Sequence, residues 1–228
     1  NASAVGTATI TDDVDATTVT LTATPSVAEG GTIVYTATLT NAAVTPLTVT
    51  LSTGQTISIA AGATSGSVSI AAPGEDPHVD AGSVSRTIAS ASGGNFEALT
   101  VNPAAATTTV TDTIDTTTLS ISGSATVAEG ASGSYTVSLT SPAQTDVTVN
   151  LAYTGTAANG ADFSGVATVT IAAGSSSATF DIATIDDLID EVAAESFTVS
   201  VTSATGGNFE NLIVSGSNNS VTTSITDN

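Results

Sequence analysis

Carboxylates are the side chains of this chain whose number and spacing could do chemistry. Asp and Glu together number 21, against one Arg and no Lys, so the formal net charge is -20. Like charges at this density repel one another in a compact chain unless a counterion neutralises them. Ca²⁺ takes six to eight oxygen ligands and tolerates irregular, loop-borne sites, whereas Mg²⁺ demands octahedral geometry. The acids therefore predict calcium binding.

The acids recur because the sequence itself repeats. The stretch from Thr9 to Thr40 returns as Thr109 to Thr140, an offset of 100. The segment GGNFE of residues 93–97 returns at 206–210, an offset of 113, so the second copy has a longer middle section. Such self-similarity is typical of a tandem array. We expect a preceding repeat's tail at residues 1–13, the first whole repeat at 14–113 and the second at 114–228.

Strands must position these acids. Apolar residues alternate with Thr and Ser, as along residues 32–40 and 197–201, and turn signals interrupt the runs. We expect an all-β fold of two tandem Ig-like antiparallel β-sandwiches, end to end, with about seven strands each. The expected strands of the first repeat are residues 17–24, 32–40, 46–51, 55–60, 65–72, 83–91 and 97–111.

Strand parity predicts where the carboxylates gather. In an antiparallel sandwich of seven strands, the first, third and fifth loops share one end with the C-terminus. We expect the metal ligands of each repeat at that end. In the second repeat they are Glu129, Asp162, Asp186, Asp187, Asp190, Glu191 and Asp227. In the first repeat they are Glu29, Glu75, Asp76, Asp80 and Asp112, and the junctions between repeats add Asp12, Asp15 and Asp115.

The junction Asp112–Asp115 is short and contains neither Gly nor Pro. A cation that bridges its two carboxylates and the loops of the first repeat would tie consecutive repeats into a rod. We expect Ca²⁺ at about 1–10 mM, a weak extracellular range, to stiffen the array. We also expect the neighbouring repeats to be the only partners of a repeat within a monomeric chain.

Charge and composition exclude several function classes. Nucleic acid needs Lys and Arg partners for its phosphates, and anionic membranes need the same. No apolar run reaches the roughly 20 residues of a membrane helix. A single histidine, His78, lies between Asp76 and Asp80, which argues against a Ser-His-Asp triad, and a zinc site there is disfavoured because the chain has no Cys. We therefore expect no enzyme and no contact with nucleic acid or membrane.

Arg86 is the one cation besides this histidine. Alignment through GGNFE places it opposite Val199, which alternation turns inward. Two arrangements are open at this point. The stem can lie along the core edge with the guanidinium in water, or the guanidinium can pair with an acid.

Three motifs resemble the extender repeats of giant bacterial RTX adhesins, both of the biofilm and of the ice-binding type. They are VAEG before a Tyr-bearing strand, GGNFE, and TDTIDTTT between the repeats. GTAANGADF in the second repeat resembles the Calx-β module. The resemblance implies Ca²⁺ ligands at Glu129, Asp162, Asp186, Asp187, Glu191 and Asp227. It also implies a secreted or bacterial cell-surface protein whose calcium-stiffened repeats hold a distal binding domain away from the cell.

A second function class remains open. The repeats could be ligand-binding adhesin modules that recognise a glycan or a protein at a sandwich tip. A lectin-like site would need exposed aromatics beside the metal, and Phe163 alone comes close to the acids in the sequence.

Overall fold

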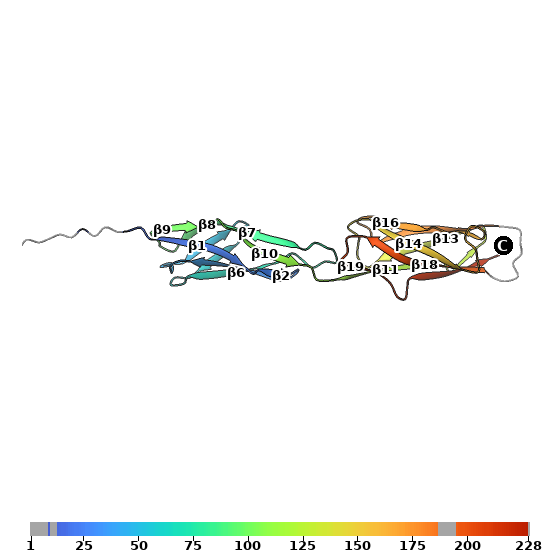
Figure 1. Ribbon diagram of the computed structural model, residues 1–228, viewed down its shortest axis with the longest axis horizontal. Coiled ribbons are helices and arrows are strands. Elements are labelled where there is room, and N and C mark those ends of the chain that lie inside the picture. Colours follow the sequence, from blue (N-terminus) through green and yellow to red (C-terminus); the bar gives the residue numbers. More distant parts are fainter. Residues whose placement is uncertain (1–8, 10–12, 187–194, 228) are drawn as a thin grey trace, which may run out of the picture. The chain divides into compact units, whose positions relative to one another are not determined.

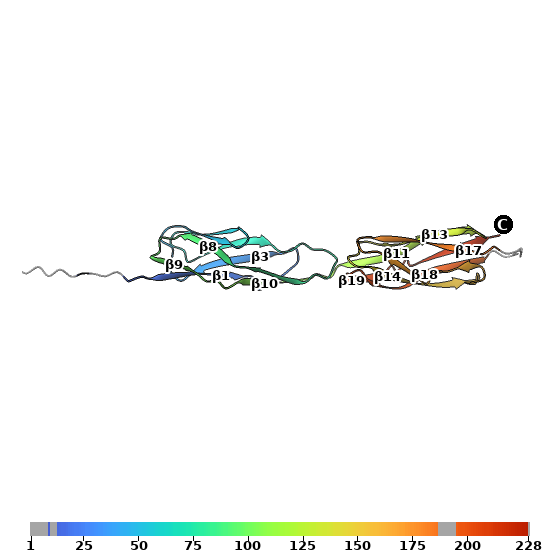
Figure 2. The same cartoon turned by 90° about the horizontal axis from the view of Figure 1, so that it is seen from above.

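The computed structural model describes residues 9, 13–186 and 195–227, and these form two compact units of β-strands (Figure 1). The first unit takes in the described residues of Asn1–Glu75 and Ala81–Thr113. The second takes in Asp76–Asp80 and the described residues of Ile114–Asn228. Figure 2 shows the strands of each unit stacked in layers. The described residues include no long apolar helix of the kind that crosses a bilayer.

Within the described residues, the first unit has ten strands. They are β1 (Ala16–Ala23), β2 (Ser26–Ala28), β3 (Thr32–Leu39), β4 (Leu47–Leu51), β5 (Thr56–Ile59), β6 (Ser65–Ala71), β7 (Gly82–Arg86), β8 (Ile88–Gly93), β9 (Ala98–Val101) and β10 (Ala106–Thr111). One sheet has the order β6-β3-β1-β9. The others have the orders β2-β10-β7 and β5-β4-β8.

The core of this unit follows from alternation. Along β3, Ile33, Tyr35, Ala37 and Leu39 are buried, whereas the residues between them face outward. Successive side chains of a strand point to opposite faces, so one face of β3 enters the core and the other carries Thr. The expected all-β sandwich fold is confirmed.

The described part of the second unit also has ten strands. They are β11 (Thr116–Gly123), β12 (Thr126–Ala128), β13 (Ser132–Leu139), β14 (Val147–Gly155), β15 (Phe163–Ser164), β16 (Thr168–Ile171), β17 (Ser177–Thr184), β18 (Glu195–Gly206), β19 (Asn211–Val214) and β20 (Ser220–Thr226). Two five-stranded sheets have the orders β15-β17-β13-β11-β19 and β12-β20-β18-β14-β16. The longer middle section of this repeat extends β14 and adds β15.

The expected closing strand 97–111 is wrong, because the chain crosses between sheets there. β9 pairs in parallel with β1, whereas β10 pairs in parallel with β2 and antiparallel with β7. Pro103 lies in the break, where it cannot donate a ladder hydrogen bond. Asn102 Oδ1 accepts the Ala104 amide over 2.9 Å and stabilises the turn. The expected strand 83–91 is likewise divided at Thr87 into β7 and β8.

Strand register confirms the placement of Arg86. It faces Ala106 across β7 and β10, and in the second unit Val199 faces Val221 at the matching position. The guanidinium carbon lies 5.8 Å from the ring centre of Tyr35, a cation–π contact. Among the described residues Arg86 forms no ion pair with a carboxylate, and its Nε is buried without a hydrogen-bond partner.

Candidate metal centre

Four acid-bearing segments of the second unit are brought together by backbone hydrogen bonds. The Glu129 amide donates to the carbonyl of Thr226 over 3.0 Å, which places the turn after β12 beside the end of β20. The Ile185 amide donates to the carbonyl of Asp162 over 2.9 Å, which joins the third and fifth loops. We call the acids that these segments carry the acid pole of the second unit: Glu129, Asp162, Asp186 and Asp227.

The turn after β12 fits closely against the fifth loop. Gly130 has a φ of 69°, in the left-handed region that favours glycine. A Cβ atom at this position would lie 3.2 Å from Cβ of Asp186. The hydroxyl of Thr184 donates to the carbonyl of Ala128 over 2.7 Å and locks the same turn against the end of β17. The glycine of the VAEG motif therefore lets the Asp186 backbone approach the turn that carries Glu129.

Asp162 is fixed by its own loop. Its Oδ2 accepts the Ala158 amide over 2.5 Å, and its amide donates to the Ala158 carbonyl over 2.9 Å. Asp side chains favour such local turns because they accept hydrogen bonds from nearby backbone amides. The added loop of the second repeat thus presents a held carboxylate at the acid pole.

The first unit builds an acid pole with the same backbone contacts. The Glu29 amide donates to the carbonyl of Thr111 over 3.1 Å, beside Asp112. A Cβ atom on Gly30 would lie 3.7 Å from Cβ of Glu75, as at the matching glycine of the second unit. The hydroxyl of Thr113 donates to Oε1 of Glu75. The acid pole of the first unit therefore comprises Glu29, Glu75 and Asp112.

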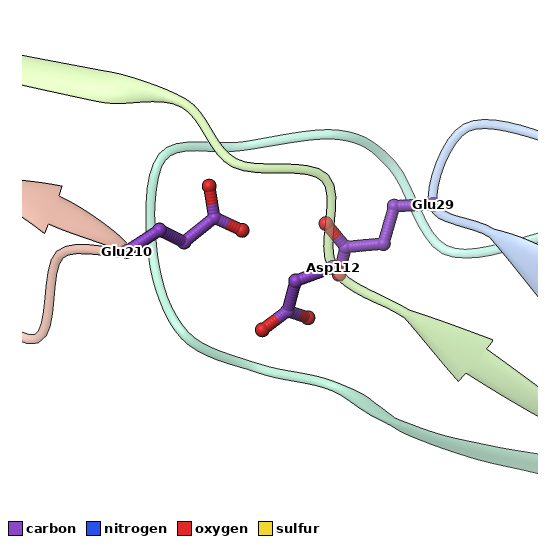
Figure 3. A group of neighbouring side chains, drawn as sticks. All are labelled: Glu29, Asp112 and Glu210. Carbon is purple, nitrogen blue, oxygen red and sulfur yellow. The ribbon is translucent and has the colours of Figure 1, made fainter.

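Glu29 and Asp112 are the pair in this pole that fits a cation best. Figure 3 shows them on neighbouring segments, Glu29 after β2 and Asp112 after β10, and their carboxylate oxygens lie within 4.8 Å of each other. Glu29 is only 6% exposed. Oδ1 of Asp112 is buried and has no hydrogen-bond partner among the described residues.

The energetics of this pair favour a bound cation. Two unit charges 4 Å apart repel by about 4 kcal/mol at an effective dielectric constant near 20. A buried charged oxygen without a donor adds a desolvation cost of about 1–3 kcal/mol or more. Hard oxygen donors of this kind are what Ca²⁺ takes. The residues present therefore fit a calcium ion.

Two acids that the sequence reasoning missed lie at the opposite end of each unit from its acid pole. Oε2 of Glu97 accepts the Asp15 amide over 2.7 Å, and Oε2 of Glu210 accepts the Asp115 amide over 2.6 Å. Oε1 of Glu210, also drawn in Figure 3, is buried without a hydrogen-bond partner within the described part of the chain. The sequence feature that could have indicated these two acids is the final Glu of GGNFE, which both repeats contain.

Other predicted ligands lie elsewhere. Asp76 and Asp80 belong to the segment that packs in the second unit. Oδ1 of Asp76 lies 3.0 Å from Nδ1 of His78, and Nε2 of His78 lies 2.9 Å from the carbonyl of Pro142. Both imidazole nitrogens thus lie within hydrogen-bond distance of an oxygen. Asp12, Asp187, Asp190 and Glu191 lie outside the described residues.

Comparison with known protein families shows to which family the chain belongs. The family described as the LapA domain matches residues 15–113 and again residues 115–228. The chain belongs to the LapA domain family. LapA domains are a bacterial adhesin family, so the two LapA domains identify a cell-surface adhesin module. Family and fold together point to a non-enzymatic structural protein with an extracellular or cell-surface location.

Several solved structures resemble the LapA domains at low identity. The crystal structure of the apo-form Calx CBD1 domain is 23% identical with a TM-score of 0.43, over 50% of this chain and 99% of that one. Escherichia coli alpha-2-macroglobulin in its native conformation is 9% identical, over 95% of this chain and 17% of that one, with a TM-score of 0.33. Salmonella alpha-2-macroglobulin reacted with methylamine is also 9% identical, over 92% and 16%, with a TM-score of 0.29.

These likenesses carry no argument about function at such TM-scores. The chain spans less than a fifth of the length of either macroglobulin. Among curated proteins, none matches the chain.

Proposed function

We propose that the two LapA domains are structural extender modules of an adhesin, in which Ca²⁺ bound at each acid pole stiffens the connection to the next repeat. The observation that supports this most is the buried Glu29 carboxylate beside Asp112, whose Oδ1 has no donor in the described chain. A pole of this kind is costly without a cation and stable with one.

The ligands are assigned by unit. In the first, Glu29 and Asp112 would hold the ion, with Glu75 beside them. In the second, the ligands would be Glu129, Asp162, Asp186 and Asp227. The bound ion supplies positive charge, whereas the protein supplies the backbone contacts that hold the turn after β2 against the end of β10.

The link from metal to stiffness runs through the chain after β10. Asp112 is followed by only Thr113 and Ile114 before Asp115, whose amide is already held by Glu210. Fixing the Asp112 carboxylate leaves two residues, neither of them Gly, between points that are anchored. We expect the connection to lose freedom when the ion binds and to regain it in chelator.

Small-angle scattering of the 228-residue chain tests the proposal. We expect a broad distribution of shapes in chelator and a narrow one with a longer maximum dimension in millimolar calcium. Asp112→Asn should abolish this response. Asp146→Asn is the matched control, because Asp146 accepts the Ala173 amide over 2.9 Å, is not one of the proposed ligands, and Asn keeps that acceptor. An unchanged maximum dimension, or an equal response in Asp112→Asn, would overturn the proposal.

The alternative, a glycan-binding tip, gains no support from Phe163. This side chain is 1% exposed, and its ring stacks on Phe197 with centroids 4.3 Å apart. The aromatic residue that such a site would present is part of the core.

A further inference from the structure

A short segment of the first repeat's sequence, Asp76–Asp80, packs within the second unit, and we call it the strap. The imidazole of His78 stacks on the ring of Phe209, with centroids 5.1 Å apart and planes inclined by 24°. Asp76 accepts the His78 amide over 2.8 Å, which shapes the strap into a turn before it makes any outside contact. The carbonyl of Pro142 accepts a hydrogen bond from Nε2 of the same ring.

Backbone hydrogen bonds hold the strap on both sides of this stack. The Val79 amide donates to the carbonyl of Asn208 over 3.0 Å, and the Glu210 amide donates to the carbonyl of Pro77 over 3.1 Å. The side-chain amide of Asn208 also donates to the Val79 carbonyl over 3.2 Å. The strap is thus recognised mainly through its main chain, as in β-strand addition.

The surface under the strap has a counterpart in the first unit. The segments GGNF at 93–96 and 206–209 adopt the same backbone, with φ of 81° and 82° at the second Gly and 55° and 58° at Asn. In both, a Cβ on the second Gly would overlap the Phe ring, so the ring lies across the glycine in the same way. The first unit therefore carries a preformed copy of the surface that receives the strap.

The two surfaces differ in what covers them. Phe209 is 9% exposed, whereas Phe96 is only half-buried. The carbonyl of Asn95 and the amide of Glu97, which match the groups that bind the strap, have no hydrogen-bond partner among the described residues. Beside them Val44 is 66% exposed. An apolar ring and an unpaired donor and acceptor thus lie together on one surface.

We propose that this surface of the first unit, formed by Asn95, Phe96, Glu97 and Val44, is a docking site for the strap of another copy of this repeat. The occupant is an extended Asp-Pro-His-Val segment. Its Pro carbonyl pairs with the Glu97 amide, its Val amide pairs with the Asn95 carbonyl, and its imidazole covers Phe96. The contact uses no residue of either acid pole, so it is independent of the calcium proposal.

A peptide in trans tests the site. The peptide of residues 73–82, PGEDPHVDAG, is titrated into the isotope-labelled chain in chelator, and backbone amide shifts are followed by NMR. We expect saturable shifts at Asn95, Phe96 and Glu97. Phe96→Ala, or a peptide with His78→Ala, should weaken binding about tenfold. Val34→Ala, which removes another exposed side chain, should leave binding unchanged.

A second variant calibrates the measurement. Replacing Asp76–Asp80 in the chain by Gly and Ser opens the surface at Asn208 and Phe209 to the same peptide. Binding at both surfaces, with dissociation constants within about tenfold, supports the proposal. Binding only at Asn208 and Phe209, or at neither surface, overturns it. Because chelator is present throughout, these outcomes leave the calcium proposal to its own test.

Discussion

The hydroxyl oxygen of Tyr135 lies 2.5 Å from Oγ1 of Thr223 in the core of the second unit. Thr223 in turn donates to the carbonyl of Ser124 over 2.6 Å, so the Tyr135 hydroxyl is the donor of the first bond. Tyr35 holds the same position in the first unit, and its buried hydroxyl has no hydrogen-bond partner within the described chain. The tyrosine hydroxyl is thus hydrogen-bonded in the second unit and unsatisfied among the described residues at the same position of the first.

Replacing each tyrosine by Phe should separate these environments. Tyr135→Phe leaves the Thr223 hydroxyl without its donor, and we expect a loss of about 1 kcal/mol in the stability of the second unit. Tyr35→Phe removes an unsatisfied hydroxyl, so the first unit should keep or gain stability. Hydrogen exchange of core amides in β3 and β13 reports the two units separately. Equal losses in both variants would contradict this reading.

The pH dependence of the second unit follows from the same side chain. Burial raises the pKa of Tyr135 above its ordinary value of about 10. The folded state therefore binds the phenolic proton more tightly than the unfolded chain. This contribution is fully present below the unfolded pKa and is lost as the pH rises through the folded one.

Melting temperature measured from about pH 9 upward checks the sign. It should fall as the pH rises past about 10, and the fall should be shallower in Tyr135→Phe. Tyr153, whose pKa is also raised by burial despite its hydrogen bond to Val166, accounts for part of the remaining slope. A stability that rises over this range would refute the assignment.

Asp162 offers a test that separates a cap from a ligand. Asn at this position keeps an acceptor for the Ala158 amide, whereas Ala removes it. In chelator we expect Asp162→Ala to lose about 1 kcal/mol and Asp162→Asn to lose little. In calcium both should bind the ion more weakly, because both lack the charge. Calorimetric titration and exchange of the Ala158 amide give the two readouts. Wild-type calcium affinity in Asp162→Asn would remove Asp162 from the ligand set.

Asp112→Asn should change stability in opposite directions with and without calcium. In chelator it relieves the repulsion with Glu29, and we expect a gain of about 1 kcal/mol in the first unit. In calcium it removes a ligand and should make the first unit less stable than wild type. Thermal unfolding measured in chelator and in calcium tests this reversal in the sign of the stability change. Asp146→Asn is the control, and it should shift neither unfolding curve. Parallel shifts in both conditions would contradict a cation at this pole.

Sequence patterns predicted what depends on local periodicity. Alternation placed Ile33, Tyr35, Ala37 and Leu39 on the core face of β3, as the structure shows. Loop parity brought the segments that carry Glu129 and Asp162 to the same end of the second unit as the end of β20. Both arguments need only the period of a strand and the direction of its neighbours.

Contacts set by distant partners could not be predicted in this way. From the sequence, the strap is predicted to be an acidic loop of the first repeat. Its packing could not be predicted, because the Phe209 ring on which His78 stacks lies more than a hundred residues further along the chain. Glu97 is simply the first residue of the expected strand 97–111, and the sequence shows no role for it or for Glu210 until the amides that their carboxylates bind are located. Pro103 marks in the sequence the point where the closing strand is divided. The sequence does not show that β9 then pairs with β1 and β10 with β2.

Parallel pairing in each unit decides how it responds to tension. β2 follows β1, the first strand of the first unit, and lies parallel to β10, the last one, and β12 and β20 repeat the arrangement. A pull on the two ends slides these strands past each other, so their cross-strand bonds are loaded in shear and must fail together. Each unit thus carries a three-residue mechanical clamp between its incoming and outgoing chain.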